Sequence, residues 1–412
     1  MGNVPPPPGS SWPAAPEGPE GRAAGSYTQE QTWAGPPGGG GLTPPGGHPV
    51  AGADPSVWAW PPPRPVRTSE FACAELPEGE SYHRLGRTSR FRWWTTPLTL
   101  AVFAVLAFFL WMAILLSVTI VAIIGGSGLA PESVTISTIA ELAFGLLSSA
   151  LFIPIVLFLV RVVQWRRIGS LLSVEGRLRW GWLARCTVVA VFPVALCAAA
   201  FLPLAKALHP GLVPSEATGG TEVFAAAMTV IVLLVPFQSA AEELTMRGLL
   251  MQLVGAIGAR SGERGGGSAV SRVLRSPGPA ILASGTLFAA LYLATHPDEV
   301  WTTAALAVMG LGTAWLTWRT GGLEAAVGLH VVNSLVQFTL CVFEGRMEQI
   351  GTGLVVGSGL PLGAGSPLIL LLTLVQVGLY TLVVVWLANR RGVRRRSAEV
   401  PAAAPRLRGR FA

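Results

Sequence analysis

The sequence carries little charge. Only 12% of its 412 residues are charged and 51% are apolar, whereas soluble domains carry about 25% charged residues. Several charge-free runs reach about 20 residues, the length that crosses the hydrocarbon core of a bilayer. An outer-membrane barrel would show short alternating segments instead. The composition therefore excludes an ordinary soluble domain and predicts an all-α, polytopic membrane protein.

Cysteine is also scarce. Three of the four cysteines lie in apolar runs and none forms a CxxC pair, which argues against a disulfide framework and against a cysteine-based zinc site. No HExxH motif occurs among the five histidines. The N-terminus lacks a basic region followed by an apolar stretch, so no cleavable signal peptide is expected and the first apolar run is expected to direct insertion.

Proline and glycine are concentrated at the N-terminus, in stretches such as AGPPGGGGLTPPGG. Such a composition cannot bury enough apolar surface to fold, so residues 1–90 are predicted to form a disordered cytoplasmic tail. The tail either docks a partner or serves as a solvated tether. A membrane domain is expected over 91–396, and residues 397–412 form a short cytoplasmic C-terminal tail.

The apolar runs predict about eight transmembrane helices. Each run is long enough to span a bilayer as a helix of 1.5 Å rise per residue. The predicted spans are Pro97–Ile124, Ile139–Val163, Trp182–Leu204, Phe224–Gly255, Pro279–Thr295, Val300–Trp318, Leu323–Phe343 and Pro367–Ala388.

The net charge of +7 is distributed as a topology signal. Arginines cluster before the first span, in alternate loops and after the last span, for example Arg87, Arg166 and Arg390. The opposite loops hold only Lys206 and Arg346 as cations. By the positive-inside rule both termini are expected in the cytoplasm of a multi-pass protein of the cell membrane. The bilayer, and no nucleic acid, is the expected partner of this charge.

The fourth span ends in the charged stretch SAAEELTMRGLL, residues 239–250. On a helix of about 100° per residue, Glu243 and Arg247 share a face and can pair. Glu242 points about 100° away from Glu243 and lacks this partner, which suits a general base. The alternative is that the three charges only mark the inner membrane surface, although intramembrane carboxylates usually have a function.

Other spans carry further polar side chains. The seventh contains His330, Asn333 and Ser334, and His330 lies roughly 10 Å from its cytoplasmic start, at a depth similar to that of Glu242. A helix–helix hydrogen bond is the alternative reading of a buried histidine. In the fifth span Tyr292 lies one turn before His296, which the pattern favours as a histidine at the helix end.

The motif EELTMR, the phrase TWRTGGLEAAVGLHVVN and the order of the spans resemble the CPBP family. This family comprises CAAX prenyl proteases with bacteriocin-processing and abortive-infection (Abi) relatives. The resemblance covers about residues 165–345. It implies an all-helical membrane core and intramembrane endopeptidase activity on a peptide or protein substrate, in which a glutamate and a histidine activate water.

The resemblance also assigns roles to residues. Glu242 matches the water-activating base, Glu243 and Arg247 match its supporting pair, and His330 matches a histidine that helps to hold the oxyanion. Two positions depart from the family pattern. Tyr292 stands where the second histidine is expected, and Ser334 stands where an asparagine is expected, with Asn333 one position earlier.

These departures affect the expected chemistry. Tyrosine is a poor general base and a rare zinc ligand, and losing an acid–base partner typically costs about 10²–10⁴-fold in rate. Zinc needs three protein ligands, which leaves a metal possible but favours a metal-free glutamate mechanism. The predicted function is therefore an intramembrane endopeptidase. The alternatives are a catalytically degenerate scaffold or bacteriocin-immunity protein of the same family, and a transporter with intramembrane carboxylates.

Overall fold

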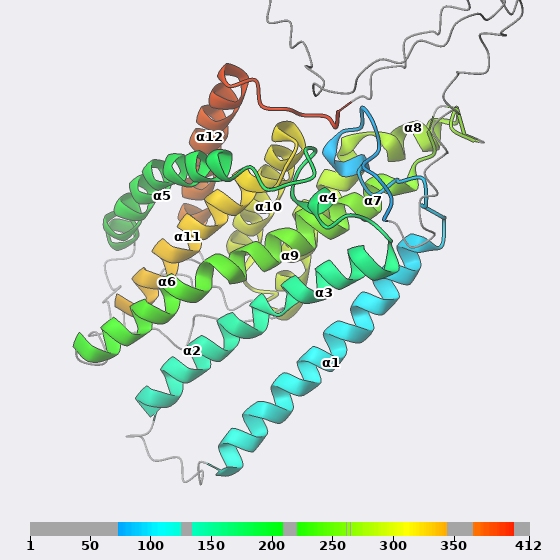
Figure 1. Cartoon of the computed structure of the whole chain (residues 1–412). Helices are drawn as coiled ribbons and strands as arrows, with labels where there is room; N and C mark the ends of the chain where they lie inside the picture. The colour runs from blue at the N-terminus through cyan, green and yellow to red at the C-terminus, as the bar shows by residue number, and fades with distance from the viewer. Residues whose placement is uncertain are drawn as a thin grey trace, which may run out of the picture. The chain divides into compact units, whose positions relative to one another are not determined.

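A computed structural model describes residues 73–124, 134–208, 221–260, 262–263, 265–343 and 366–398 (Figure 1). Within these ranges the chain is helical, and pairing between extended segments is limited to isolated bridges. The all-α prediction is confirmed. Residues 125–133 and 344–365, residues 1–72 of the predicted N-terminal tail and the predicted C-terminal tail from 399 onward lie outside the described residues.

Eight helical segments of the described chain are long and apolar enough to cross a membrane, which confirms the predicted number of spans. They are Thr95–Ser117, Ile139–Val163, Trp180–Phe201, Thr221–Ile257, Pro277–Thr295, Val300–Thr320, Glu324–Phe343 and Pro367–Arg390. Each matches one predicted span, with ends that differ by a few residues.

Six of these spans are single helices or parts of one. The elements are α1 (Thr95–Ile124), α5 (Trp180–Leu208), α9 (Pro277–Thr295), α10 (Val300–Thr320), α11 (Glu324–Phe343) and α12 (Pro367–Arg390).

The other two spans contain a stretch of wider, π-helical geometry. The second span is built from α2 (Val134–Ala150), α3 (Phe152–Phe158) and the π-helix η4 (Leu159–Val163). The fourth is built from α6 (Thr221–Glu243), the π-helix η5 (Leu244–Leu250) and α7 (Met251–Ile257). Short helices η2 (Tyr82–Arg84), α4 (Gly169–Leu172) and α8 (Ala269–Arg275) lie between or beside the spans.

Helix α11 lies inside the bundle. It packs against α5, α6 and α10, while α12 covers α5 and α10 and α9 packs on α10 (Figure 1). Helix α1 lies at the edge and contacts α3 and η4. Many of its large apolar side chains, such as Phe108 and Phe109, are exposed, as expected for a helix that faces lipid. The interior position of α11 brings its polar side chains against three neighbouring helices.

Helices α9 and α10 approach each other closely through glycine. A Cβ atom on Gly310 would lie 2.0 Å from the carbonyl oxygen of Gly285, and one on Gly285 would lie 2.8 Å from the Cα atom of Leu311. Small residues allow such backbone contact between membrane helices, where van der Waals packing drives association. The contact also fixes the Gly310 carbonyl, to which Arg247 is bound in the site described below.

The segment before α1 is packed, which corrects the predicted tail boundary at residue 90. Tyr82 and Leu85 are fully buried in a core cluster with residues of α4, η5 and α7. Arg84 donates hydrogen bonds to the carbonyls of Gly255 and Gly258, at 2.8 and 2.7 Å. Carbonyls at a helix C-terminus lack partners within the helix, so this arginine caps α7 and ties residues 73–90 to the membrane domain.

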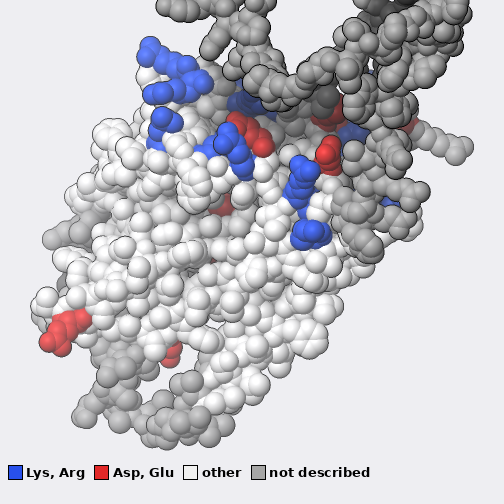
Figure 2. All heavy atoms as spheres, in the orientation of Figure 1, with Lys and Arg blue, Asp and Glu red and all other residues white. Residues whose placement is uncertain are grey.

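Arginine side chains gather at one end of the helical domain. This is the end at which α1, α5, α9 and α11 begin and α7, α10 and α12 finish, and Figure 2 shows the blue side chains of the visible face collected there. We call it the arginine-rich end. Several of its arginines hold the structure together: Arg179, for example, pairs with the fully buried Glu324 at 2.6 Å and also donates to the Thr320 carbonyl.

Candidate functional site

Four side chains from two helical spans form one hydrogen-bonded cluster. The carboxylate oxygen Oε1 of Glu243 lies 3.2 Å from Nη1 of Arg247 and 2.7 Å from Nδ1 of His330. The other ring nitrogen of His330, Nε2, lies 3.5 Å from Oε2 of Glu242. The expected Glu243–Arg247 pair is present, and Glu242 and His330 face each other across α6 and α11. We call these four residues the Glu242–His330 cluster.

The cluster has a buried layer and a more open layer. The side chains of Glu243 and Arg247 are 1% and 7% exposed, whereas those of Glu242 and His330 are 23% and 21% exposed. The buried pair holds the Nδ1 edge of the histidine ring. Glu242 and His330 are the members of the cluster that stay partly exposed, and their Oε2 and Nε2 atoms face each other.

A π-helical stretch positions the arginine. Helix α6 ends at Glu243, and η5, which follows at once, contains Arg247. The wider turn of a π-helix is rare and is found mostly at functional sites. In this position the Arg247 side chain reaches Glu243 and also donates to the Gly310 carbonyl on α10 at 3.4 Å. From the sequence, this stretch was predicted to be regular α-helix, and its π-helical geometry was not expected.

Gln238 is a partner of the glutamate that the sequence analysis missed. Its Nε2 atom donates to Oε1 of Glu242 from one turn earlier on α6, and the Ser239 hydroxyl donates to the Gln238 amide oxygen at 3.2 Å. The available signal was an uncharged polar side chain four residues before Glu242, at the spacing of helix neighbours. Gln238 fixes one carboxylate oxygen and leaves the other toward His330.

A small cavity lies beside Glu242. Its volume is about 30 Å³, and Phe288, Phe152 and Thr245 are among its lining residues. A cavity of this size can hold a water molecule when polar partners are present, and the Glu242 carboxylate supplies them. Phe288 lies on α9, so this helix contributes to the surroundings of the glutamate.

The cluster is electrically neutral only if it binds one proton in addition to the one on Nδ1 of His330. Arg247 and Glu243 cancel each other, which leaves Glu242 facing His330. The Nδ1 atom of His330 points to the Glu243 carboxylate and is therefore the protonated nitrogen. An unbalanced charge is costly inside a membrane domain, so a neutral cluster has one further proton on Glu242 or on the Nε2 atom of His330.

Tyr292 and Asn333, two of the other predicted site residues, bond outside the cluster. The Tyr292 hydroxyl donates to the Glu299 carboxylate at 2.6 Å, and its ring stacks on His296 with the ring centroids 4.5 Å apart. His296 caps the C-terminal end of α9, which matches its expected place at a helix end. Asn333 accepts a hydrogen bond from Gln376 of α12 at 2.9 Å. Ser334 is buried on α11, one turn beyond His330.

A comparison with known families finds a match. Residues 223–336 match the family model of the type II CAAX prenyl endopeptidases, described as Rce1-like. Over this segment the chain is similar to the CAAX protease (CPBP) family. The matched residues lie within the expected core and contain α9, α10 and all four residues of the Glu242–His330 cluster. No curated protein and no solved structure matches the chain.

The donor atoms of the Glu242–His330 cluster do not fit a zinc ion. Zinc in hydrolases is held by three protein side chains. Glu243 meets His330 at Nδ1, so a metal at Nε2 would lie on the far side of the ring from Glu243, with only Glu242 as a second donor. In the described part of the chain, no group of three His, Cys, Asp or Glu side chains could hold a metal ion.

Proposed function

We propose that the protein is an intramembrane endopeptidase in which Glu242 activates a water molecule. The observation that carries the proposal is the facing pair of Glu242 Oε2 and His330 Nε2, 3.5 Å apart, beside a cavity of about 30 Å³. A carboxylate and an imidazole within reach of one water are the groups that general acid–base hydrolysis needs. Similarity to a membrane endopeptidase family supports the same reaction class.

In the proposed reaction the additional proton of the cluster resides on the Nε2 atom of His330. The Glu242 carboxylate takes a proton from water as the water oxygen attacks the carbonyl carbon of the peptide. The Nε2–H group of His330 donates to the oxyanion that develops, and Glu243, held by Arg247, stabilises the imidazolium through Nδ1. When the C–N bond breaks, Glu242 returns the proton to the leaving amine.

The two departures from the family pattern shape this proposal. Ser334, one turn beyond His330, takes the place of the second oxyanion donor, with a side chain shorter than asparagine. Tyr292 does not supply a base, and Gln238 orients Glu242 in its place. We expect the reaction to be slower than with a second histidine, because one acid–base partner is worth about 10²–10⁴-fold.

The proposed orientation places the arginine-rich end in the cytoplasm. Cytoplasmic loops of membrane proteins carry an excess of arginine and lysine, and the described arginines gather at this end (Figure 2). Because α1 begins and α12 ends there, both chain termini are assigned to the cytoplasm of a multi-pass membrane protein.

The test is cleavage by the purified protein in lipid nanodiscs, with a library of peptides that includes prenylated members. We expect Glu242→Gln to lower cleavage by at least about 10²-fold, since it removes the base. Glu222→Gln is the matched control, because Glu222 is exposed in the first turn of the same helix. Cleavage that is equal in the Glu242→Gln variant and the wild type refutes the proposal.

The bond between Tyr292 and Glu299 favours one alternative, a catalytically degenerate scaffold or bacteriocin-immunity protein. This bond directs the Tyr292 side chain toward the end of α9, where it does not take part in acid–base catalysis. A Tyr292→His variant separates the two functions. An increase of about tenfold or more in Glu242-dependent cleavage supports the endopeptidase, whereas unchanged cleavage with loss of a bound partner supports the scaffold.

A further inference from the structure

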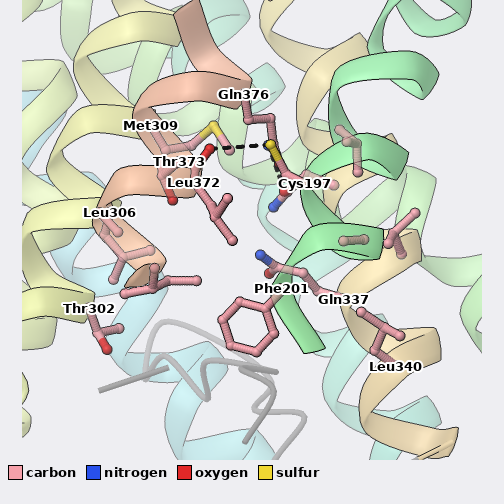
Figure 3. A pocket seen from close by; sticks show the side chains of 16 residues that line it. Cys197, Phe201, Thr302, Leu306, Met309, Gln337, Leu340, Leu372, Thr373 and Gln376 are labelled. Carbon is pink, nitrogen blue, oxygen red and sulfur yellow. Dashed lines mark hydrogen bonds between the residues drawn. The ribbon is translucent and has the colours of Figure 1, made fainter. Parts of the chain in front are cut away.

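A second cavity lies between α5, α10, α11 and α12, deeper in the bundle. Its volume is about 100 Å³ (Figure 3). Phe201, Met309 and Leu372 are among its apolar lining residues. Gln337, on α11, follows Glu324 by 13 residues, which places the cavity about 20 Å from the arginine-rich end. It therefore lies along the membrane-spanning part of the helices and not in a loop.

Uncharged amide side chains line this cavity. Asn333, Gln337 and Gln376 contribute to its wall, and none of its lining residues is charged. Gln376 donates to Asn333 at 2.9 Å, which joins α11 to α12. Gln337 points into the cavity (Figure 3), and no hydrogen bond joins its amide to the residues that the structure describes. The contact between α11 and α12 explains the amides of Asn333 and Gln376. It leaves the Gln337 amide available to a bound ligand.

An amide without a partner is costly at this depth. Burial of a peptide-like amide without a hydrogen bond costs roughly 1–3 kcal/mol by mutational measures. Each amide side chain has two N–H donors and an oxygen with two lone pairs, so Asn333 and Gln376 also retain free groups after pairing with each other. The wall of the cavity is thus suited to a neutral guest that both donates and accepts hydrogen bonds.

The size and spacing of the site fit a peptide. An apolar cavity of about 150 Å³ holds benzene, with six carbon atoms, so about 100 Å³ holds a group of about four or five atoms, such as one peptide unit. Asn333 and Gln337 are four residues apart, which is about 6 Å along α11. Alternate residues of an extended chain are about 6.6 Å apart, so the two amides can meet successive peptide groups on one edge.

The cavity begins close to the Glu242–His330 cluster. Asn333 follows His330 by one turn of α11, and Met309 of the cavity precedes Gly310, which accepts from Arg247. We propose that Gln337 and Asn333 bind the backbone of an extended, uncharged substrate segment that continues from the cleavage point toward the opposite membrane face. This inference rests on the proposed endopeptidase function, and it names the substrate class.

The membrane makes such a site necessary. A peptide bond must be reached in an extended chain, yet an extended backbone in hydrocarbon lacks partners for its N–H and C=O groups. Side-chain amides supply those partners without requiring an edge strand, which the described helices do not provide. The site therefore favours substrate segments whose side chains are small and uncharged.

The test measures binding without turnover. The Glu242→Gln protein is placed in nanodiscs, and empty nanodiscs correct for partition into lipid. The probe is a fluorescent peptide of alternating Val and Ala, together with a series in which one N–H is replaced by an ester oxygen. Gln337→Leu preserves side-chain size, and Thr339→Val is the control, because Thr339 bonds only the Leu335 carbonyl of its own helix.

We expect Gln337→Leu to weaken peptide binding about fivefold, the value of one neutral hydrogen bond. One ester position should weaken binding to the parent protein by a similar factor and have no further effect on Gln337→Leu. In active protein the same variant should raise KM and leave kcat nearly unchanged. Thr339→Val should leave binding unchanged.

The outcomes also separate this inference from the proposed function. Peptide binding that depends on Gln337, without cleavage by the protein that retains Glu242, supports the site and refutes the endopeptidase. Glu242-dependent cleavage with equal binding by parent and Gln337→Leu proteins refutes the site, as does an ester effect that persists in Gln337→Leu. A lipid or water molecules alone in the cavity would give this last pattern.

Discussion

Removal of the Arg247 charge should destabilise the protein strongly. The Arg247 and Glu243 side chains are 7% and 1% exposed and lie 3.2 Å apart, so solvent does not screen their interaction. An Arg247→Met change keeps the side-chain length and leaves the buried Glu243 carboxylate with His330 Nδ1 as its remaining partner. Loss of one member of a buried ion pair costs about 3–5 kcal/mol, which lowers the folded-to-unfolded ratio by more than about 100-fold.

The matched control removes both charges. In the double variant Glu243→Gln, Arg247→Met no unpaired charge stays buried, so its stability should return to within about 1–2 kcal/mol of the parent. Reversible unfolding in mixed detergent micelles measures the four members of this double-mutant cycle, and peptide cleavage should stay low in all three variants. If the stability lost in the double variant equals the sum of the losses in the two single variants, the two side chains are not coupled and the reasoning is refuted.

Two further predictions concern packing and pH. Gly310→Ala should lower stability by about 1–3 kcal/mol, because its Cβ would meet the Gly285 carbonyl at 2.0 Å; thermal unfolding that matches the parent contradicts the close crossing. Burial holds the pKa of His83 below its ordinary value of 6.5, so the packing of residues 73–92 is fully stable above that value and weakens as pH falls below it. The hydrogen-exchange protection factors of these residues, which correct for the intrinsic pH dependence of exchange, should be smaller at pH 5.5 than at pH 7.5, and His83→Gln should remove the difference.

The sequence alone predicted the spans because their signal is strong. A run of about 20 uncharged residues is rare outside membrane helices, and each of the eight runs became a span whose centre lies within about five residues of the predicted one. The Glu243–Arg247 pair was also accessible, because neighbours at i and i+4 on one helix need no knowledge of the fold. The contact between Glu242 and His330 was expected only because the two residues were predicted to lie at similar depths on separate helices.

Contacts between distant segments were not accessible in this way. The Gly285–Gly310 crossing depends on how α9 and α10 approach, and single glycines in membrane helices are common. The Tyr292–Glu299 bond depends on the turn between α9 and α10. The packing of residues 73–90 was missed because their composition continues that of the tail, while the deciding contact, Arg84 on the α7 carbonyls, joins residues about 170 apart.

The fourth span is longer than a bilayer is thick. Thr221–Ile257 contains 37 residues, about 55 Å of helix against a hydrocarbon core of about 30 Å. Glu242 follows Thr221 by 21 residues, or about 32 Å, so a helix that starts at one boundary of the hydrocarbon brings this carboxylate to the other. In the proposed endopeptidase, a substrate cut at that level would be divided unequally: one fragment would be released into the aqueous phase, while the remainder would stay anchored in the lipid.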